Sequence, residues 1–193
     1  MNNVPRLFIP GPVSVHPDIM EAMSKPMIGH RTPEFSELFQ DVVKGIQKVL
    51  KTKNRIYLST SSATGLMEAA VRNTVKNRCL NLVCGAFSKR WHDITVACGL
   101  EADSMEVEWG HAIHPEDVKK ALSKAQYDVI TLVHNETSTG VMTPIEDLVK
   151  TIRANSNALI LVDAVSSMAG VNIPVDDLRL DVCLASVQKA WGL

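Results

Sequence analysis

Two residues near the end of the sequence have side chains that could do chemistry together. Asp163 directly follows an apolar run at residues 158–162, and Lys189 comes shortly after a second run at residues 182–186. A short apolar run bounded by polar residues is typical of a buried parallel strand. Open α/β sheets bind their ligands beyond the carboxyl ends of such strands. We therefore predict that this acid and this lysine face one crevice.

A lysine and a carboxylate in one crevice are the pair that pyridoxal phosphate chemistry needs. The lysine can hold the aldehyde of the cofactor as a Schiff base, and the carboxylate can keep the pyridine nitrogen protonated. The alternative for Lys189, one of twelve lysines in the sequence, is an ordinary solvated surface charge. The pair alone does not decide between these two interpretations of Lys189. The decision depends on the segments upstream.

Composition excludes several classes of function. The 193 residues carry a net charge of −1 and a pI near 6.6, with 46% hydrophobic and 21% charged residues, as in an ordinary globular protein. There is no basic stripe for nucleic acid, no apolar stretch as long as a membrane span, and no apolar signal-peptide core at the start. We therefore expect a cytoplasmic protein.

The cysteines and histidines give little support to a metal or disulfide site. His111 and His114 have a spacing that could bind zinc on a helix, but Gly110 and Pro115 flank them and favour a loop. No cysteine pair has the spacing of a metal or redox motif, so reduced thiols in or near the core are favoured. The four cysteines are Cys79, Cys84, Cys98 and Cys183.

The first part of the chain differs from the rest. Residues 1–33 contain six of the nine prolines, which predicts an extended arm with one short helix at residues 17–23. Such an arm is expected to lie across the body of the molecule or across a partner subunit. From Pro33 onward, apolar residues recur every three or four positions, which predicts an amphipathic helix ending near Thr52. We therefore divide the chain into an arm, residues 1–33, and a body, residues 34–193.

A segment rich in hydroxyl groups follows this helix. A short strand is expected at residues 56–60, and residues 61–65 open the next helix. Free backbone N–H groups at the positive end of a helix dipole can bind an anion such as phosphate. The alternative is an ordinary N-cap by Ser62 or Thr64. The run of hydroxyl residues before Ala63 is longer than a cap needs, so phosphate binding is a candidate function here.

From this point strands and helices alternate with short connections. This pattern is typical of right-handed βαβ units and predicts an α/β fold with a mostly parallel sheet sandwiched by helices. The expected strands cover residues 80–84, 102–109, 128–134, 158–162 and 182–186, and the expected helices cover residues 88–98, 115–124 and 144–154.

Two further loops reach the same edge of the predicted sheet. Phe87 begins a helix just after Gly85, where its ring could stack on a ligand or tuck under the helix start as a hydrophobic staple. The segment at residues 136–140 is polar and ends in glycine, which suits either a ligand contact or a plain turn.

Seven short motifs, in order along the whole chain, resemble those of class V aminotransferases of the alanine–glyoxylate and serine–pyruvate group. They cover residues 10–12, 29–35, 62–70, 85–87, 134–140, 162–166 and 186–189. The resemblance implies the large domain of the aspartate-aminotransferase-like (fold type I) pyridoxal phosphate enzymes. Residues 34–193 would be that cofactor-binding domain, incomplete at its C-terminal end, with the small domain absent.

The resemblance also implies a role for each matching residue. Lys189 would form the Schiff base and carry a proton between the substrate Cα and C4′ of the cofactor. Asp163 would pair with the pyridinium nitrogen, Phe87 would stack on the ring where relatives often have tryptophan, and Thr137 would hydrogen-bond the 3′-oxygen. The phosphate would be held by Ser62, Ala63, Thr64 and Gln188.

The resemblance to the family also favours one reaction, and it indicates that family members are longer than this chain. Cysteine desulfurases carry histidines at the positions of Phe87 and Gln188, so transamination between a small amino acid and a 2-oxo acid such as glyoxylate or pyruvate is favoured. The family has about twice this length, with the substrate-binding arginine in a smaller domain after the lysine. We therefore expect a homodimer, a separate polypeptide supplying that domain, or both. The alternative is a truncated, non-catalytic module that binds cofactor or dimerises.

Overall fold

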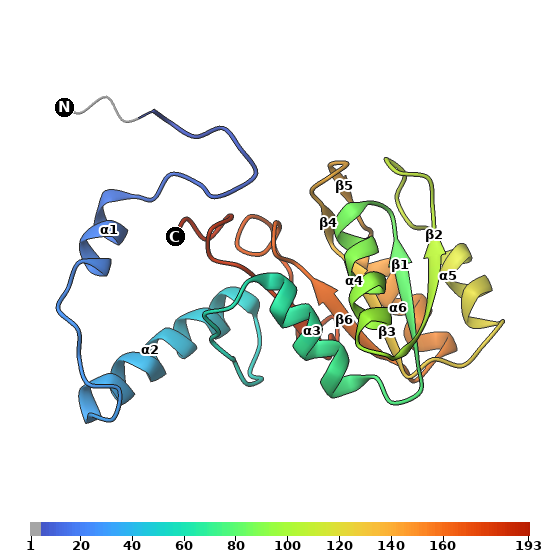
Figure 1. The fold of residues 1–193 in the computed structure, drawn as a ribbon, viewed down its shortest axis with the longest axis horizontal. Helices are drawn as coiled ribbons and strands as arrows, with labels where there is room; N and C mark the ends of the chain where they lie inside the picture. Colours follow the sequence, from blue (N-terminus) through green and yellow to red (C-terminus); the bar gives the residue numbers. More distant parts are fainter. Residues whose placement is uncertain (1–4) are drawn as a thin grey trace.

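A parallel sheet forms the centre of the computed structural model, which describes residues 5–193. The five strands lie in the order β2-β1-β3-β6-β7, and every neighbouring pair is parallel. Figure 1 labels the first four of these strands. The α/β fold with a mostly parallel sheet is therefore confirmed. The strands are β1 (Arg78–Val83), β2 (Glu101–Glu106), β3 (Val129–Val133), β6 (Leu159–Asp163) and β7 (Val182–Leu184).

Helices cover both faces of this sheet, which explains why its central strands are uninterrupted apolar runs. Alternate residues of β3 point to opposite sides: Ile130 packs with α5 and α6, whereas Val129 packs with α3 and α4. No helix in residues 5–193 is both long and apolar enough to cross a membrane. The four helices are α3 (Ala63–Thr74), α4 (Ala86–Ala97), α5 (Pro115–Leu122) and α6 (Ile145–Asn155).

The N-terminal part has the predicted form, an extended segment with one short helix, α1 (Pro17–Met23), followed by the long helix α2 (Pro33–Leu50). Figure 1 shows α1 and much of α2 extending away from the sheet. Hydrogen bonds at both ends fasten this part to the body, and Leu50 at the end of α2 also packs in the core. The Val13 N–H donates to the carbonyl of Gln188 at 3.2 Å, and the carboxylate of Asp176 accepts hydrogen bonds from the turn after α2.

One prediction about local structure was wrong. The segment at residues 56–60 is not a strand, because no backbone in the described part of the chain pairs with it; Tyr57 is 76% exposed there. The segment at residues 136–140, for which a ligand contact and a plain turn were both open, includes the turn of a small antiparallel hairpin, β4 (Asn135–Glu136) and β5 (Val141–Met142). Gly140 adopts a φ of 75°, a conformation that favours glycine, and its N–H donates to the Glu136 carbonyl.

Candidate active site

Asp163, the last residue of β6, is a buried carboxylate with spare bonding capacity. Its side chain is 4% exposed, and Oδ1 accepts a hydrogen bond of 2.8 Å from the Val165 N–H. Within residues 5–193 no group donates to Oδ2. The pKa of Asp163 is raised to about 6, chiefly by burial; the charge of Glu136 adds to the rise, whereas the hydrogen bond from Val165 and the charges of Arg90 and Lys189 oppose it. A cationic ligand group at Oδ2 would favour the ionised form.

Lys189 lies in the turn after β7, half-buried and in contact with the N-terminal arm. A methyl group at position 11 would lie 2.6 Å from Cδ and 2.9 Å from Nζ of Lys189, closer than such atoms can approach. Gly11 therefore leaves room for the lysine side chain. The hydrogen bond between Val13 and Gln188 holds the arm beside it. The sequence marked residues 10–12 as a family motif, but it gave no physical reason for the glycine.

The start of α3 presents free hydrogen-bond donors. Ser62 has the backbone conformation of an N-cap, but its side chain makes no capping hydrogen bond. Across residues 5–193, the N–H groups of Ala63 and Thr64 have no acceptor. Thr64 is not the N-cap either, because it lies inside α3, where its hydroxyl accepts a hydrogen bond of 3.2 Å from Arg90 Nη1. These donors at the positive end of the helix suit an anion.

Phe87 lies in the first turn of α4, half-buried against the core cluster between α3, α4 and the sheet. The guanidinium of Arg90, one helical turn later, lies over the ring at 4.9 Å from its centroid. Arg90 thus joins the starts of α3 and α4 through Thr64 and Phe87. Sequence reasoning missed Arg90, although its spacing of three residues from Phe87 on a helix places both on one face.

Thr137 lies in the turn between β4 and β5, half-exposed, and its hydroxyl makes no hydrogen bond within the described residues. The preceding residue, Glu136, is fully buried and accepts hydrogen bonds from the start of α4. Sequence reasoning treated Glu136 only as part of a polar loop. The turn is therefore built around a buried carboxylate.

The parallel strands bring the candidate residues to one edge of the sheet. Asp163 is the last residue of β6, and Phe87, Thr137 and Lys189 lie in the segments that follow β1, β4 and β7. Arg90 connects Phe87 to the start of α3. The edge thus combines a buried carboxylate, a lysine, a half-buried aromatic ring and free N–H groups. This set fits a flat ligand with a cationic ring nitrogen, a carbonyl and an anionic tail.

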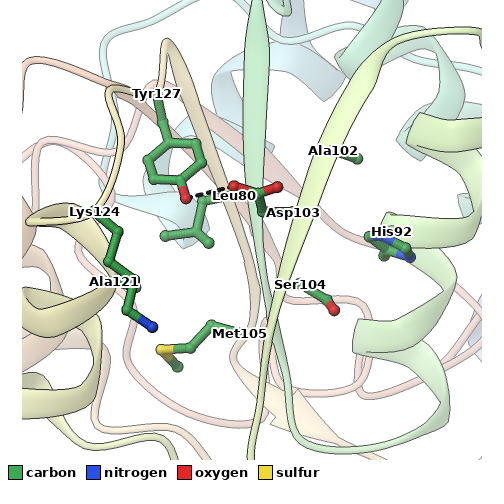
Figure 2. A pocket seen from close by; sticks show the side chains of 9 residues that line it. All are labelled: Leu80, His92, Ala102, Asp103, Ser104, Met105, Ala121, Lys124 and Tyr127. Atoms are coloured by element: carbon green, nitrogen blue, oxygen red, sulfur yellow. Dashed lines mark hydrogen bonds between the residues drawn. The ribbon is translucent and has the colours of Figure 1, made fainter.

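A separate cavity of about 380 Å³ lies along the edge strand β2, away from these residues (Figure 2). Its acid, Asp103, is already paired, because it accepts a hydrogen bond of 2.6 Å from Tyr127 and forms an ion pair of 2.7 Å with Arg78. Figure 2 shows Tyr127 and Lys124 on one side of β2 and His92 on the other. The cavity contains none of the candidate residues, so it is not the candidate active site.

The fold and the edge residues define an α/β domain of the type that binds its ligand beyond the carboxyl ends of parallel strands. The chain matches the sequence model of the Aminotransferase class-V family over residues 19–193 and belongs to that family, whose members are pyridoxal phosphate enzymes. The predicted family and cofactor class are therefore confirmed.

Individual relatives agree with this assignment. The chain is 41% identical to an uncharacterised aminotransferase of Methanocaldococcus jannaschii, over 95% of this chain and 48% of that protein. It is 33% identical to serine–glyoxylate aminotransferase of Hyphomicrobium methylovorum, over 100% of this chain and 49% of that protein. The crystal structure of alanine–glyoxylate aminotransferase from Nostoc sp. gives a TM-score of 0.91 at 31% identity, over 98% of this chain and 51% of that one. The chain spans about half the length of the curated relatives that it matches.

Proposed function

We propose that this chain is the cofactor-holding part of a pyridoxal-phosphate-dependent aminotransferase. It would act in the transfer of an amino group between a small amino acid and a 2-oxo acid such as glyoxylate or pyruvate. The observation that carries the proposal is the buried carboxylate of Asp163, whose Oδ2 has no donor in residues 5–193 and which shares an edge with Lys189. The names of the serine–glyoxylate and alanine–glyoxylate relatives support the substrate class.

Each candidate residue has a physical role in this proposal. The cofactor, when bound, supplies an electron sink for negative charge on the substrate Cα. Asp163 holds a proton on the ring nitrogen, Phe87 orients the ring, and Thr137 donates to the 3′-oxygen. Lys189 would hold the cofactor through Nζ and would carry a proton to and from the substrate. The phosphate is held by Ser62, Ala63, Thr64 and Gln188.

We also propose that the chain works in an assembly, either as a homodimer, with a separate polypeptide that supplies a C-terminal domain, or both. Large apolar side chains on α1 and α2, including Met20, Met23, Leu38 and Phe39, are exposed, and such surfaces commonly mark interfaces. Residues 1–33 would be an arm that reaches a neighbour, and residues 34–193 the cofactor-binding domain.

The four free cysteines support a cytoplasmic location.

The function can be tested by spectroscopy, mapping and assay. With pyridoxal phosphate, the protein should show a visible absorption band that an amino donor shifts, and borohydride reduction with peptide mapping should place the adduct on Lys189. An adduct on another lysine would contradict this assignment. Amino acids should be screened against glyoxylate and pyruvate, with and without any polypeptide that co-purifies. Cofactor binding without turnover in every combination would favour a non-catalytic module.

A further inference from the structure

We infer that Glu136 is a positioning residue that fixes Phe87 relative to Thr137, so that both can contact one cofactor ring. This inference rests on the proposed function, because that function gives these two residues their contacts. Glu136 itself touches neither the substrate nor the cofactor in this proposal. It acts by joining two connections that follow different strands, β1 and β3.

The carboxylate of Glu136 is fully buried and every oxygen is occupied. Oε1 accepts hydrogen bonds from the Phe87 N–H at 3.2 Å and the Ser138 hydroxyl at 2.7 Å. Oε2 accepts from the Ser88 N–H and the Ser88 hydroxyl, both at 2.8 Å. The Ser138 hydroxyl in turn accepts from the Ala86 N–H at 3.0 Å. The carboxylate thus caps the start of α4 from a different part of the chain.

The surroundings of Glu136 keep it charged despite its burial. Burial alone would raise the pKa of Glu136, but the hydrogen bonds from Ser88, Ser138 and Phe87 outweigh it and hold the pKa below its usual value. The positive end of the α4 dipole favours the same ionised form. A neutral or shorter side chain would leave donors at the start of α4 without an acceptor, which is costly in a buried site.

Gly85 gives the carboxylate its space. A methyl group at position 85 would lie 2.5 Å from Cγ of Glu136 and 2.7 Å from Oγ of Ser138. The φ of Gly85 is 170°, an extended value that any residue can adopt. The glycine is therefore needed for space, because it lets the Glu136 side chain lie close to the backbone at position 85. The segment 85–88 and the segment 136–138 therefore form one unit, with Phe87 in one half and Thr137 in the other.

The test compares Glu136→Gln with a matched control, Asp128→Asn. Asp128 also accepts hydrogen bonds from successive backbone N–H groups, those of residues 76–78, but it lies before β3, at the opposite end of the sheet. In the cofactor-free protein, Glu136→Gln should speed amide hydrogen exchange at Phe87 and Ser88 by about tenfold or more, since hydrogen bonds to charged groups are strong. Asp128→Asn should speed exchange only near residues 76–78.

A second readout uses pyridoxine 5′-phosphate, which has no aldehyde and so reports the non-covalent site alone. Glu136→Gln should raise its Kd by about tenfold, whereas Asp128→Asn should leave the Kd unchanged. Unchanged exchange and Kd in Glu136→Gln would overturn the inference, as would equal weakening by Asp128→Asn.

If Glu136→Gln does not fold, Ser138→Ala removes one donor and should give the same changes at smaller size. If the unmodified protein binds neither pyridoxine 5′-phosphate nor pyridoxal phosphate, the proposed function fails. The exchange rates would still show whether Glu136 holds the start of α4.

Discussion

At the scale of single residues, the buried carboxylate of Asp163, for which we propose a role in cofactor binding, carries a cost in stability. Its pKa is raised from 3.8 to about 6 in the cofactor-free protein, chiefly by burial. A carboxyl group whose pKa is raised on folding destabilises the folded state when it ionises. The cost is absent below pH 3.8, grows between pH 3.8 and 6, and is complete above pH 6. From this shift we expect a cost of about 3 kcal/mol at pH 8.

The first prediction follows from this cost. Asp163→Asn should raise the unfolding temperature of the cofactor-free protein at pH 8, because the neutral amide avoids burying a charge. The same variant should bind cofactor weakly and lose transamination by orders of magnitude. Thermal unfolding at several pH values, with and without pyridoxal phosphate, measures the effect. Equal stability of both proteins at pH 8, or near-normal turnover by the variant, would contradict it.

Gly11 leads to a second prediction at this scale. In Gly11→Ala the new methyl group would occupy space now taken by the end of the Lys189 side chain, and the φ of 149° adds backbone strain. Because the lysine is flexible, it can move aside, so we expect Schiff-base formation with pyridoxal phosphate to slow while the folded body keeps its circular dichroism. Stopped-flow absorbance measures the rate. Gly45→Ala, where the added methyl meets nothing within 4 Å, is the control.

At the scale of elements, the central strands were predictable because burial on both faces demands continuous apolar runs. The segment at residues 56–60 begins with three apolar residues, yet a strand also needs a partner, and its sequence contains no information about one. Asp163 and Lys189 could be placed at an edge because each follows such a run. Glu136 could not be recognised, because its partners Phe87 and Ser88 lie about fifty residues earlier in the chain. The sequence gives no sign of this contact.

The connection between α2 and the body gives a third prediction. Asp176 accepts hydrogen bonds from the Thr52 hydroxyl, the Lys53 N–H and the Asn54 side chain, and these bonds lower its pKa. Asp176→Ala should therefore lower the unfolding temperature at pH 7, and the difference from the unmodified protein should disappear as the pH falls from 3.8 through the lower folded-state pKa.

The neighbouring exposed residue offers a matched control for this test. Asp177→Ala removes the same charge one position away, where no hydrogen bond is formed within residues 5–193. It should leave the unfolding temperature nearly unchanged. Equal effects of the two substitutions would show that net charge, not the connection to α2, is responsible.

At the scale of the whole molecule, the exposed apolar surface of α2 predicts association. Leu38, Phe39 and Val42 lie close together on this helix and are exposed, so a partner that covers them would remove apolar area from water. The protein should therefore scatter light as a dimer or larger complex, and Phe39→Glu should shift it toward the monomer. Lys44→Glu, on the same helix, is the control for charge. A monodisperse monomer of the unmodified protein would contradict this prediction.

The contact between the arm and the lysine segment has a consequence for the order of folding. Val13 and Gln188 lie 175 residues apart in the sequence, and contacts of such long range carry a high entropic cost of loop closure. The sheet can form from its neighbouring βαβ units before this contact closes. We therefore expect the arm to reach its position beside Lys189 late in folding. The chain would then gain its ability to capture the cofactor only after the body has formed, and folding intermediates would leave this lysine exposed to other aldehydes.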